Sequence, residues 1–94
     1  MSFLIRTCAE YDGWYEKLDR LSQAQIEKRL SAIKNDEHFG HTRHIEAGLC
    51  ELKFNNGIRI YFYRSGTKEI TLVYGGTKHG QDKDIKKAKV IFNK

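Results

Sequence analysis

The alternation of apolar and polar residues is clearest over residues 49–64. Two alternating runs flank a loop that ends in Gly57, and this glycine can take the left-handed conformation that a three-residue hairpin loop requires. The sequence therefore predicts a β-hairpin in which Lys53 lies opposite Arg59. A two-residue loop would mix apolar and polar residues on both faces, so we reject it. The predicted apolar face consists of Cys50, Leu52, Phe54, Ile58, Ile60 and Phe62.

The opposite face of this hairpin is expected to be cationic and aromatic. It carries Glu51, Lys53, Arg59, Tyr61 and Tyr63. Two cations that face each other destabilise a sheet unless an anion lies near them. Such a face suits an anionic ligand whose bases can stack, as RNA does. The alternative is a solvent-facing polar surface on which Glu51 neutralises Arg59.

A different spacing of apolar residues, at i, i+4 and i+7, predicts two helices before the hairpin. The first covers residues 10–21, and the second runs from Ser22 to about residue 34, with Ser22 and Gln25 at capping-box spacing. The joint between them is very short, which predicts an antiparallel helical hairpin. The expected buried stripes are Trp14, Leu18 and Leu21 in the first helix and Ile26, Leu30 and Ile33 in the second.

The rest of the pattern predicts further strands and one more helix. These elements are strands over residues 3–7, 45–54, 58–64 and 69–74, a loop over 35–43, and a helix over 82–93 with Ile85, Ala88 and Phe92 inward. We therefore predict one α+β domain over residues 1–94, in which an N-terminal helical hairpin packs on a twisted, mainly antiparallel sheet and a C-terminal helix follows. The cationic face of the β-hairpin is expected to be open or covered by a partner.

Composition and charge narrow the class of protein. The chain has 94 residues, of which 39% are hydrophobic and 31% charged, as in soluble globular proteins. Its formal net charge of +5 favours a nucleic acid or an acidic protein as partner, and a solvated lysine-rich surface is the alternative. We find no signal-peptide or membrane-span pattern, so we expect a cytoplasmic protein without membrane contact. Cys8 and Cys50 are expected to be free, buried thiols, and a disulfide between them is the alternative.

Two further groups of residues carry candidate chemistry. The segment Gly75-Gly76-Thr77-Lys78 follows the last predicted strand, and backbone amides in such a turn can hold an anion; the alternative is a flexible turn. His38, His41 and His44 are spaced by three, but no cysteine or carboxylate completes a zinc-ligand pattern, so no metal is expected. Because histidine can donate a proton near neutral pH, His79 is either a candidate acid or an ordinary surface residue.

Several of these segments, taken together, resemble one family. They are Gly48-Leu49-Cys50-Glu51-Leu52-Lys53, Gly57-Ile58-Arg59-Ile60-Tyr61-Phe62, Gly75-Gly76-Thr77-Lys78 and Gln81-Asp82-Lys83-Asp84-Ile85 with Ala88-Lys89. In this order they are similar to the RelE/ParE toxin superfamily, and within it to the HigB-like branch of addiction-module killer proteins. The resemblance extends over about residues 11–92.

The resemblance implies a RelE-like fold and a role as the toxin of a type II toxin–antitoxin pair, neutralised by an antitoxin protein from the adjacent gene. RelE-like members cleave mRNA at the ribosome, whereas ParE-like members inhibit DNA gyrase. We expect the first activity, that of an mRNA endoribonuclease (an mRNA interferase) that inhibits translation. The alternative is a gyrase inhibitor without nuclease activity. A third hypothesis, a non-toxic RNA-binding module, predicts no growth defect.

The resemblance also points to individual residues. Arg59 matches the family's arginine after the hairpin glycine, and Lys78 matches the lysine of its Gly-Gly-x-Lys segment. Lys53 stands where this branch often has arginine, while Gln81 and Asp84 match the opening of the last helix. The chain departs from the pattern of the branch at two places, Thr77 and His79-Gly80.

The expected reaction is a metal-independent cleavage in which the 2′-hydroxyl of the RNA attacks the adjacent phosphorus. Arg59 would stabilise the developing charge. The base would be Glu51 or a lysine beside another cation, and the acid would be Tyr61 or His79. No cofactor is expected. The predicted catalytic residues are Arg59, Glu51, Tyr61, Lys78 and His79, and the predicted RNA-binding residues are Lys53, Arg59, Tyr61, Tyr63, Lys78 and Gln81.

Overall fold

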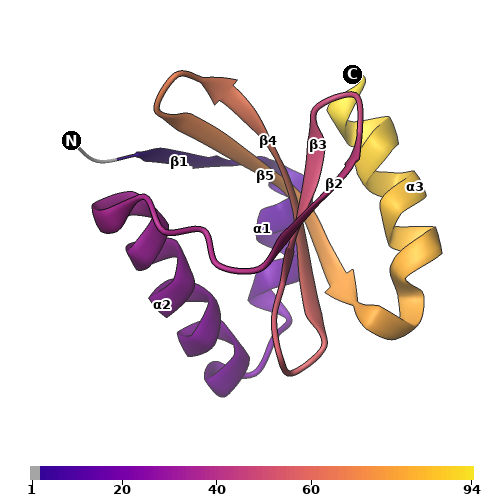
Figure 1. The fold of residues 1–94 in the computed structure, drawn as a ribbon. Coiled ribbons are helices and arrows are strands. Elements are labelled where there is room, and N and C mark those ends of the chain that lie inside the picture. Colours follow the sequence, from indigo (N-terminus) through magenta and orange to yellow (C-terminus); the bar gives the residue numbers. More distant parts are fainter. Residues whose placement is uncertain (1–2) are drawn as a thin grey trace.

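The computed structural model describes residues 3–94, which form a five-stranded sheet with helices on both of its faces (Figure 1). In chain order the elements are β1 (Leu4–Thr7), α1 (Ala9–Glu16), α2 (Arg20–Asp36), β2 (Thr42–Glu46), β3 (Leu49–Lys53), β4 (Ile58–Gly66), β5 (Glu69–Thr77), a 3₁₀ turn (Lys78–Gly80) and α3 (Gln81–Phe92). None of the helices in this part of the chain is long and apolar enough to cross a membrane.

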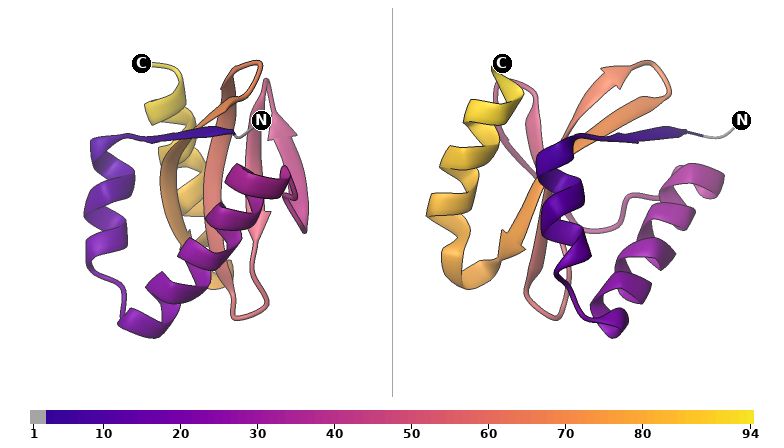
Figure 2. Two further views of the ribbon diagram at one scale, coloured as in Figure 1. Left: turned by 90° about the vertical axis from the view of Figure 1, so that its left-hand side faces the viewer. Right: turned by 180° about the vertical axis from the view of Figure 1, so that it is seen from behind.

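The strands lie in the order β1-β5-β4-β3-β2. Neighbouring strands from β2 to β5 pair antiparallel, whereas β1 pairs parallel with β5 at one edge of the sheet. Helices α1 and α2 form a helical hairpin over one face, and α3 lies on the other face (Figure 2). This arrangement confirms the predicted α+β fold.

The β3–β4 hairpin has the predicted register. Lys53 pairs with Arg59, and Gly57 adopts the left-handed conformation, with φ of 94°. The loop is closed by two backbone hydrogen bonds, from the Phe54 N–H to the Ile58 carbonyl at 3.0 Å and from the Gly57 N–H to the Phe54 carbonyl at 3.1 Å. The alternation of faces follows directly from this loop.

The first core lies between the sheet and the helices α1 and α2. Ile26 and Ile33 of α2 have no exposed surface there, as predicted. Leu21, which the apolar spacing places in the same core, is instead 68% exposed. That prediction is wrong because α1 already ends at Glu16 and α2 begins at Arg20, so the stripe of the first helix does not continue to residue 21.

The boundaries of α2 differ from the predicted ones at both ends. Asp19, and not Ser22, precedes the first turn, and the Asp19 side chain makes no capping hydrogen bond. At the other end the helix continues to Asp36 and stops at Glu37, which takes a left-handed conformation with φ of 54°. An ion pair of 2.6 Å with Lys68 holds the Glu37 side chain.

The predicted strand over residues 45–54 is in fact two strands. β2 and β3 pair antiparallel around a tight turn at Ala47 and Gly48, whose φ angles are 47° and 91°. Two successive positive φ angles are typical of a type I′ turn, which Asn-Gly or Asp-Gly usually marks in a sequence. Alanine at the first position gives no such signal, and for this reason the sequence did not reveal β2.

The face of the sheet that carries Arg59 is not open, because α3 covers much of it. Leu49, Tyr61 and Val73 are buried there against Ala88, which faces inward as predicted. The expectation of an open or partner-covered face is therefore wrong for this part of the sheet. The sheet has a core on each side, and the second core belongs to the chain itself.

Gly75 and Gly76 lie inside β5. The prediction of a turn at this place is therefore wrong, both as an anion-binding turn and as a flexible turn. A methyl group at Gly75 would collide with the Trp14 ring, and one at Gly76 would collide with the Asp84 carboxylate. The two glycines therefore let α1 and α3 approach the strand closely from opposite sides.

Replacing Gly75 by alanine should destabilise the protein, because the new methyl group has to displace the Trp14 indole. Overpacking of this kind lowers the free energy of unfolding by about 1–3 kcal/mol. The matched control is Gly13→Ala in α1, where nothing lies within 4 Å of the added carbon and the helix should gain up to about 1 kcal/mol. Urea denaturation measures both effects, and a Gly75→Ala protein as stable as wild type would contradict this packing.

Candidate functional site

Three cationic residues gather near the tip of the β3–β4 hairpin. Arg59 lies opposite Lys53 on one side and opposite Gly76 on the other. Because β5 returns to the same end of the sheet, Lys78 follows there and donates its backbone N–H to the Gly57 carbonyl at 2.8 Å. Its side chain passes beside Gly57. The structure thus brings Lys53, Arg59 and Lys78 to one end of the sheet.

The guanidinium of Arg59 is half-buried and held by the hairpin loop itself. Its Nη1 donates to the carbonyl of Phe54 at 3.1 Å and to that of Ile58 at 2.9 Å. Its Nε is buried and has no hydrogen-bond partner within residues 3–94. The carbonyls of Phe54 and Ile58 fix the orientation of the guanidinium, and an anion can be bound by those of its donors that reach the surface.

Glu51 is a fully buried carboxylate with two partners. The Nε of Arg43 donates to its Oε1 at 3.1 Å from the neighbouring strand β2, and the Nε2 of Gln81 donates to its Oε2 at 2.6 Å from the start of α3. A buried charge is tolerated when it is paired and hydrogen-bonded in this way. Arg43 was not among the predicted site residues, since it is recognised as the partner of Glu51 only when β2 is known.

Tyr61 lies directly opposite Glu51 and is also fully buried. Its hydroxyl has no hydrogen-bond partner in the described part of the chain. Burial and the nearby carboxylates of Glu51 and Asp84 raise the pKa of Tyr61 above its ordinary value, so the phenol stays protonated near neutral pH. In this conformation the ring cannot stack on a base, because no part of it reaches the surface.

The other predicted site residues differ in how much of them a ligand can reach. Lys78 and His79 are exposed neighbours in the 3₁₀ turn. Tyr63 is half-buried, with its ring centroid 4.8 Å from that of Phe92 in α3. The amide of Gln81 is occupied by its bond to a buried carboxylate. The exposed groups near the hairpin tip are therefore mainly basic.

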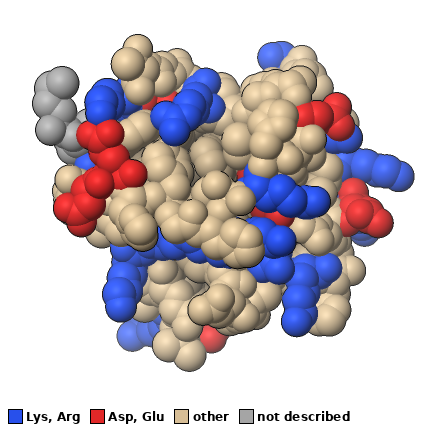
Figure 3. Space-filling view, viewed as in Figure 1, with Lys and Arg blue, Asp and Glu red and all other residues tan. Residues whose placement is uncertain are grey.

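The surface around this site is basic but not uniformly so. Lys and Arg side chains gather between β2 and α3 on the face seen in Figure 3, with a few acidic side chains among them. His38, His41 and His44 are exposed, and residues 3–94 contain no group of three or more side chains that could hold a metal ion. The chemistry that this arrangement supports is the binding of an anion by fixed cations.

Asp84, in the first turn of α3, is a second carboxylate near Tyr61. Burial raises its pKa above the ordinary value, and the Thr77 backbone N–H and the nearby lysines Lys83 and Lys87 only partly oppose this effect. Gly76 leaves the space that the carboxylate occupies. In its charged form Asp84 is therefore a mildly unfavourable part of the folded protein.

The stability of an Asp84→Asn variant relative to wild type should rise as the pH increases from about 3 to 7. The reason is that folded Asp84 binds its proton more tightly than an unfolded aspartate does, so wild type loses stability as the pH passes from the unfolded pKa to the raised folded one. Urea denaturation across this range measures the difference. Asp82→Asn, which changes an exposed residue in the same turn, is the control, and parallel curves for the two variants would contradict the placement of Asp84.

Comparisons with known proteins give one relative and a group of solved structures. A scan of the sequence against models of protein families finds no match. An uncharacterized protein of Haemophilus influenzae is 33% identical over an alignment 94 positions long, which covers 97% of this chain and 94% of that protein. With this identity over nearly the whole of both chains, common descent is shown.

The similar solved structures are RelE toxins. A mutant of Escherichia coli RelE in the free state has a TM-score of 0.69 at 13% identity, and the match covers 93% of this chain and 98% of that one. The toxin–antitoxin complex RelBE2 of Mycobacterium tuberculosis gives a TM-score of 0.68 at 9% identity, with 82% and 99% covered. At such low identities these structures establish the fold.

Proposed function

Since the chain belongs to the same family as the Haemophilus influenzae protein and has the RelE fold, we propose that it is the toxin of a type II toxin–antitoxin pair. Its partner would be an antitoxin from the adjacent gene, and a net charge of +5 suits an acidic antitoxin segment. We assign it to the HigB-like branch on the ordered segments between residues 48 and 89, as a single-domain protein of the cytoplasm.

The proposed activity is endonucleolytic cleavage of mRNA on the ribosome. The observation that carries this proposal is the meeting of Lys53, Arg59 and Lys78 at the tip of the β3–β4 hairpin. Cations that converge on one point attract a phosphodiester and stabilise the extra negative charge of its transition state. The fixed guanidinium of Arg59 is the group best placed for that charge.

In the proposed reaction the ribose 2′-hydroxyl attacks the adjacent phosphorus in line. A base takes the 2′ proton, the bond from phosphorus to the 5′ oxygen breaks, and an acid donates a proton to the leaving oxygen. The products are a 2′,3′-cyclic phosphate and a 5′-hydroxyl. Arg59 stabilises the charge on the phosphoryl oxygens, Lys53 and Lys78 hold the phosphate, and the exposed His79 is the acid.

Glu51 and Tyr61, the other candidates for proton transfer, lie beneath α3. Glu51 is hydrogen-bonded to Gln81 at 2.6 Å, so α3 has to move before this carboxylate can reach a ribose. With α3 in place, the groups that reach a bound RNA are Lys53, Lys78 and His79. Glu51 can therefore act as the base only if the helix opens, and Lys53 keeps its role of holding the phosphate.

The burial of Glu51 and Tyr61 beneath α3 also favours a second candidate function, that of a ParE-like inhibitor of DNA gyrase without nuclease activity. Such a protein needs a complementary surface but no accessible acid or base, and α3 with its exposed lysines supplies one. The two functions differ in the order of events after induction in cells. A nuclease first stops translation and shortens mRNA, whereas a gyrase inhibitor first causes DNA damage and arrests replication.

Arg59→Ala should abolish toxicity on induction, because the loss of one preorganised charge stabiliser slows a reaction by about a hundred-fold or more. Growth after induction is the measurement. The matched control is Arg20→Ala, which removes an exposed arginine at the start of α2 and should leave toxicity unchanged.

Because Arg59 also bonds to two loop carbonyls, the folded state of the variant has to be confirmed by circular dichroism and by its thermal midpoint. Full toxicity of a folded Arg59→Ala protein would contradict the assigned role of Arg59.

A further inference from the structure

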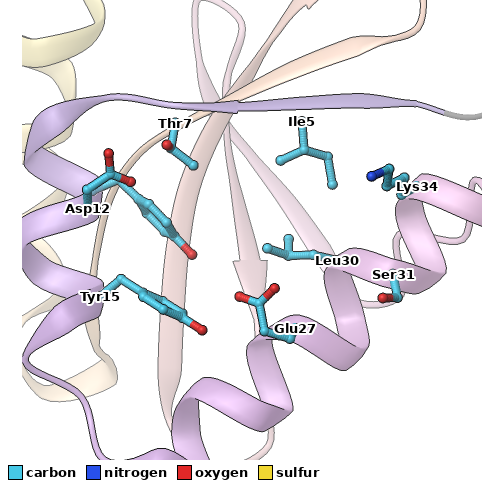
Figure 4. A pocket seen from close by; sticks show the side chains of 9 residues that line it. Ile5, Thr7, Asp12, Tyr15, Glu27, Leu30, Ser31 and Lys34 are labelled. Atoms are coloured by element: carbon cyan, nitrogen blue, oxygen red, sulfur yellow. The ribbon is translucent and has the colours of Figure 1, made fainter.

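A pocket lies in the fork between α1 and α2, on the face of the sheet opposite to α3 (Figure 4). The two helices diverge from their short joint, and β1 forms the far wall of the space between them. The pocket has a volume of about 370 Å³. The lining residues that matter below are Ile5 from β1, Tyr11, Asp12 and Tyr15 from α1, and Glu27 and Leu30 from α2.

Tyr11 supplies an unsatisfied polar atom to this pocket. Only 3% of the residue is exposed, and its hydroxyl has no hydrogen-bond partner within residues 3–94. The Tyr11 ring is stacked with that of Tyr15, with centroids 5.9 Å apart and planes inclined by 25°. Because a buried hydroxyl without a partner is unfavourable, a ligand that reaches this hydroxyl gains a hydrogen bond that the free protein lacks.

Two carboxylates, those of Asp12 and Glu27, line the pocket; that of Glu27 faces the tyrosine hydroxyls, whereas that of Asp12 lies near Thr7. Burial raises the pKa of Tyr11, and both carboxylates add to this effect; burial together with Glu27 raises the pKa of Tyr15 to about 12. Figure 4 shows the Glu27 carboxylate and the Tyr15 hydroxyl facing each other across the fork. In the described chain neither carboxylate forms an ion pair, whereas Glu10, Glu37, Glu46, Glu51 and Glu69 each do.

The pocket also has features that suit a polypeptide rather than a free ion. Ile5 and Leu30 add apolar surface against which the methylene stem of a long side chain can pack. The adjoining strand β1 is an edge strand that pairs only with β5 in the described sheet. An extended segment can lie along such an edge and direct one side chain into the fork.

From these features we propose that the pocket accepts the side chain of an arginine or lysine from a partner polypeptide that lies along β1. The cationic head pairs with Glu27 and donates a hydrogen bond to the Tyr11 hydroxyl oxygen, and the stem of the side chain packs between Tyr15 and Leu30. In a chain of net charge +5, the Glu27 carboxylate forms no ion pair within residues 3–94, and the amine of Lys34, which also lines the pocket, lies away from it near Ile5 (Figure 4). Since it lies across the sheet from Arg59, this site is independent of RNA cleavage.

A capped, strand-forming peptide, acetyl-Val-Thr-Arg-Thr-Val-amide, tests the site in an NMR titration of the full-length protein. The same peptide with citrulline in place of arginine is its neutral isostere. Amide shifts should be confined to β1, α1 and α2, and both the citrulline peptide and a Glu27→Gln protein should bind about tenfold more weakly. Glu16→Gln, which removes the same charge from an exposed position on α1, should leave the affinity unchanged.

Tyr11→Phe separates a binding role from a structural one. The substitution removes an unsatisfied hydroxyl, so it should raise the thermal midpoint of the free protein and at the same time weaken peptide binding. Equal affinity for the two peptides, unchanged affinity in Glu27→Gln, shifts centred on α3, or tighter binding of putrescine than of the arginine peptide would each overturn the proposal.

Discussion

The left-handed conformation of Gly57 is the constraint on which the rest of the structure depends. It closes a three-residue loop and thereby sets the register of β3 and β4. A shift by one residue would turn Leu52 and Ile60 out of the first core and turn Glu51 into it. It would also separate Arg59 from the loop carbonyls that hold its guanidinium. The fold and the cationic tip of the hairpin are therefore two consequences of one turn.

The sheet is covered on both faces, and the two proposed sites lie on opposite sides of it. On the α3 side, Glu51 is buried and paired with Arg43, and the Asp84 carboxylate lies over Gly76, the residue opposite Arg59 in the sheet. On the other side, the fork between α1 and α2 holds the carboxylates of Asp12 and Glu27, which form no ion pair within residues 3–94, although Lys34 also lines this pocket. We thus propose for one small domain an anion-binding end and a cation-binding pocket, separated by the thickness of the sheet.

The sequence predicts the structure correctly when two independent signals agree. At the β3–β4 hairpin, the turn residue Gly57 and the apolar alternation require the same register. The prediction fails where no residue type signals a turn, as at Ala47. Because that turn was not predicted, β2 was missed, and so was Arg43 of β2 as the partner of Glu51. An amphipathic last helix could be predicted, but its position on the sheet could not, so the burial of Tyr61 was missed. Leu21 shows that apolar spacing cannot locate a helix end when the joint is short.

The central claim is that the cations at the hairpin tip serve RNA cleavage. The most direct measurement is the mapping of RNA 5′ ends in cells within minutes of induction, with separate capture of ends that carry a 5′-hydroxyl. The mechanism through 2′-hydroxyl attack predicts new 5′-hydroxyl ends inside translated reading frames, formed before any DNA damage response. Intact mRNA together with early DNA breaks would contradict this mechanism.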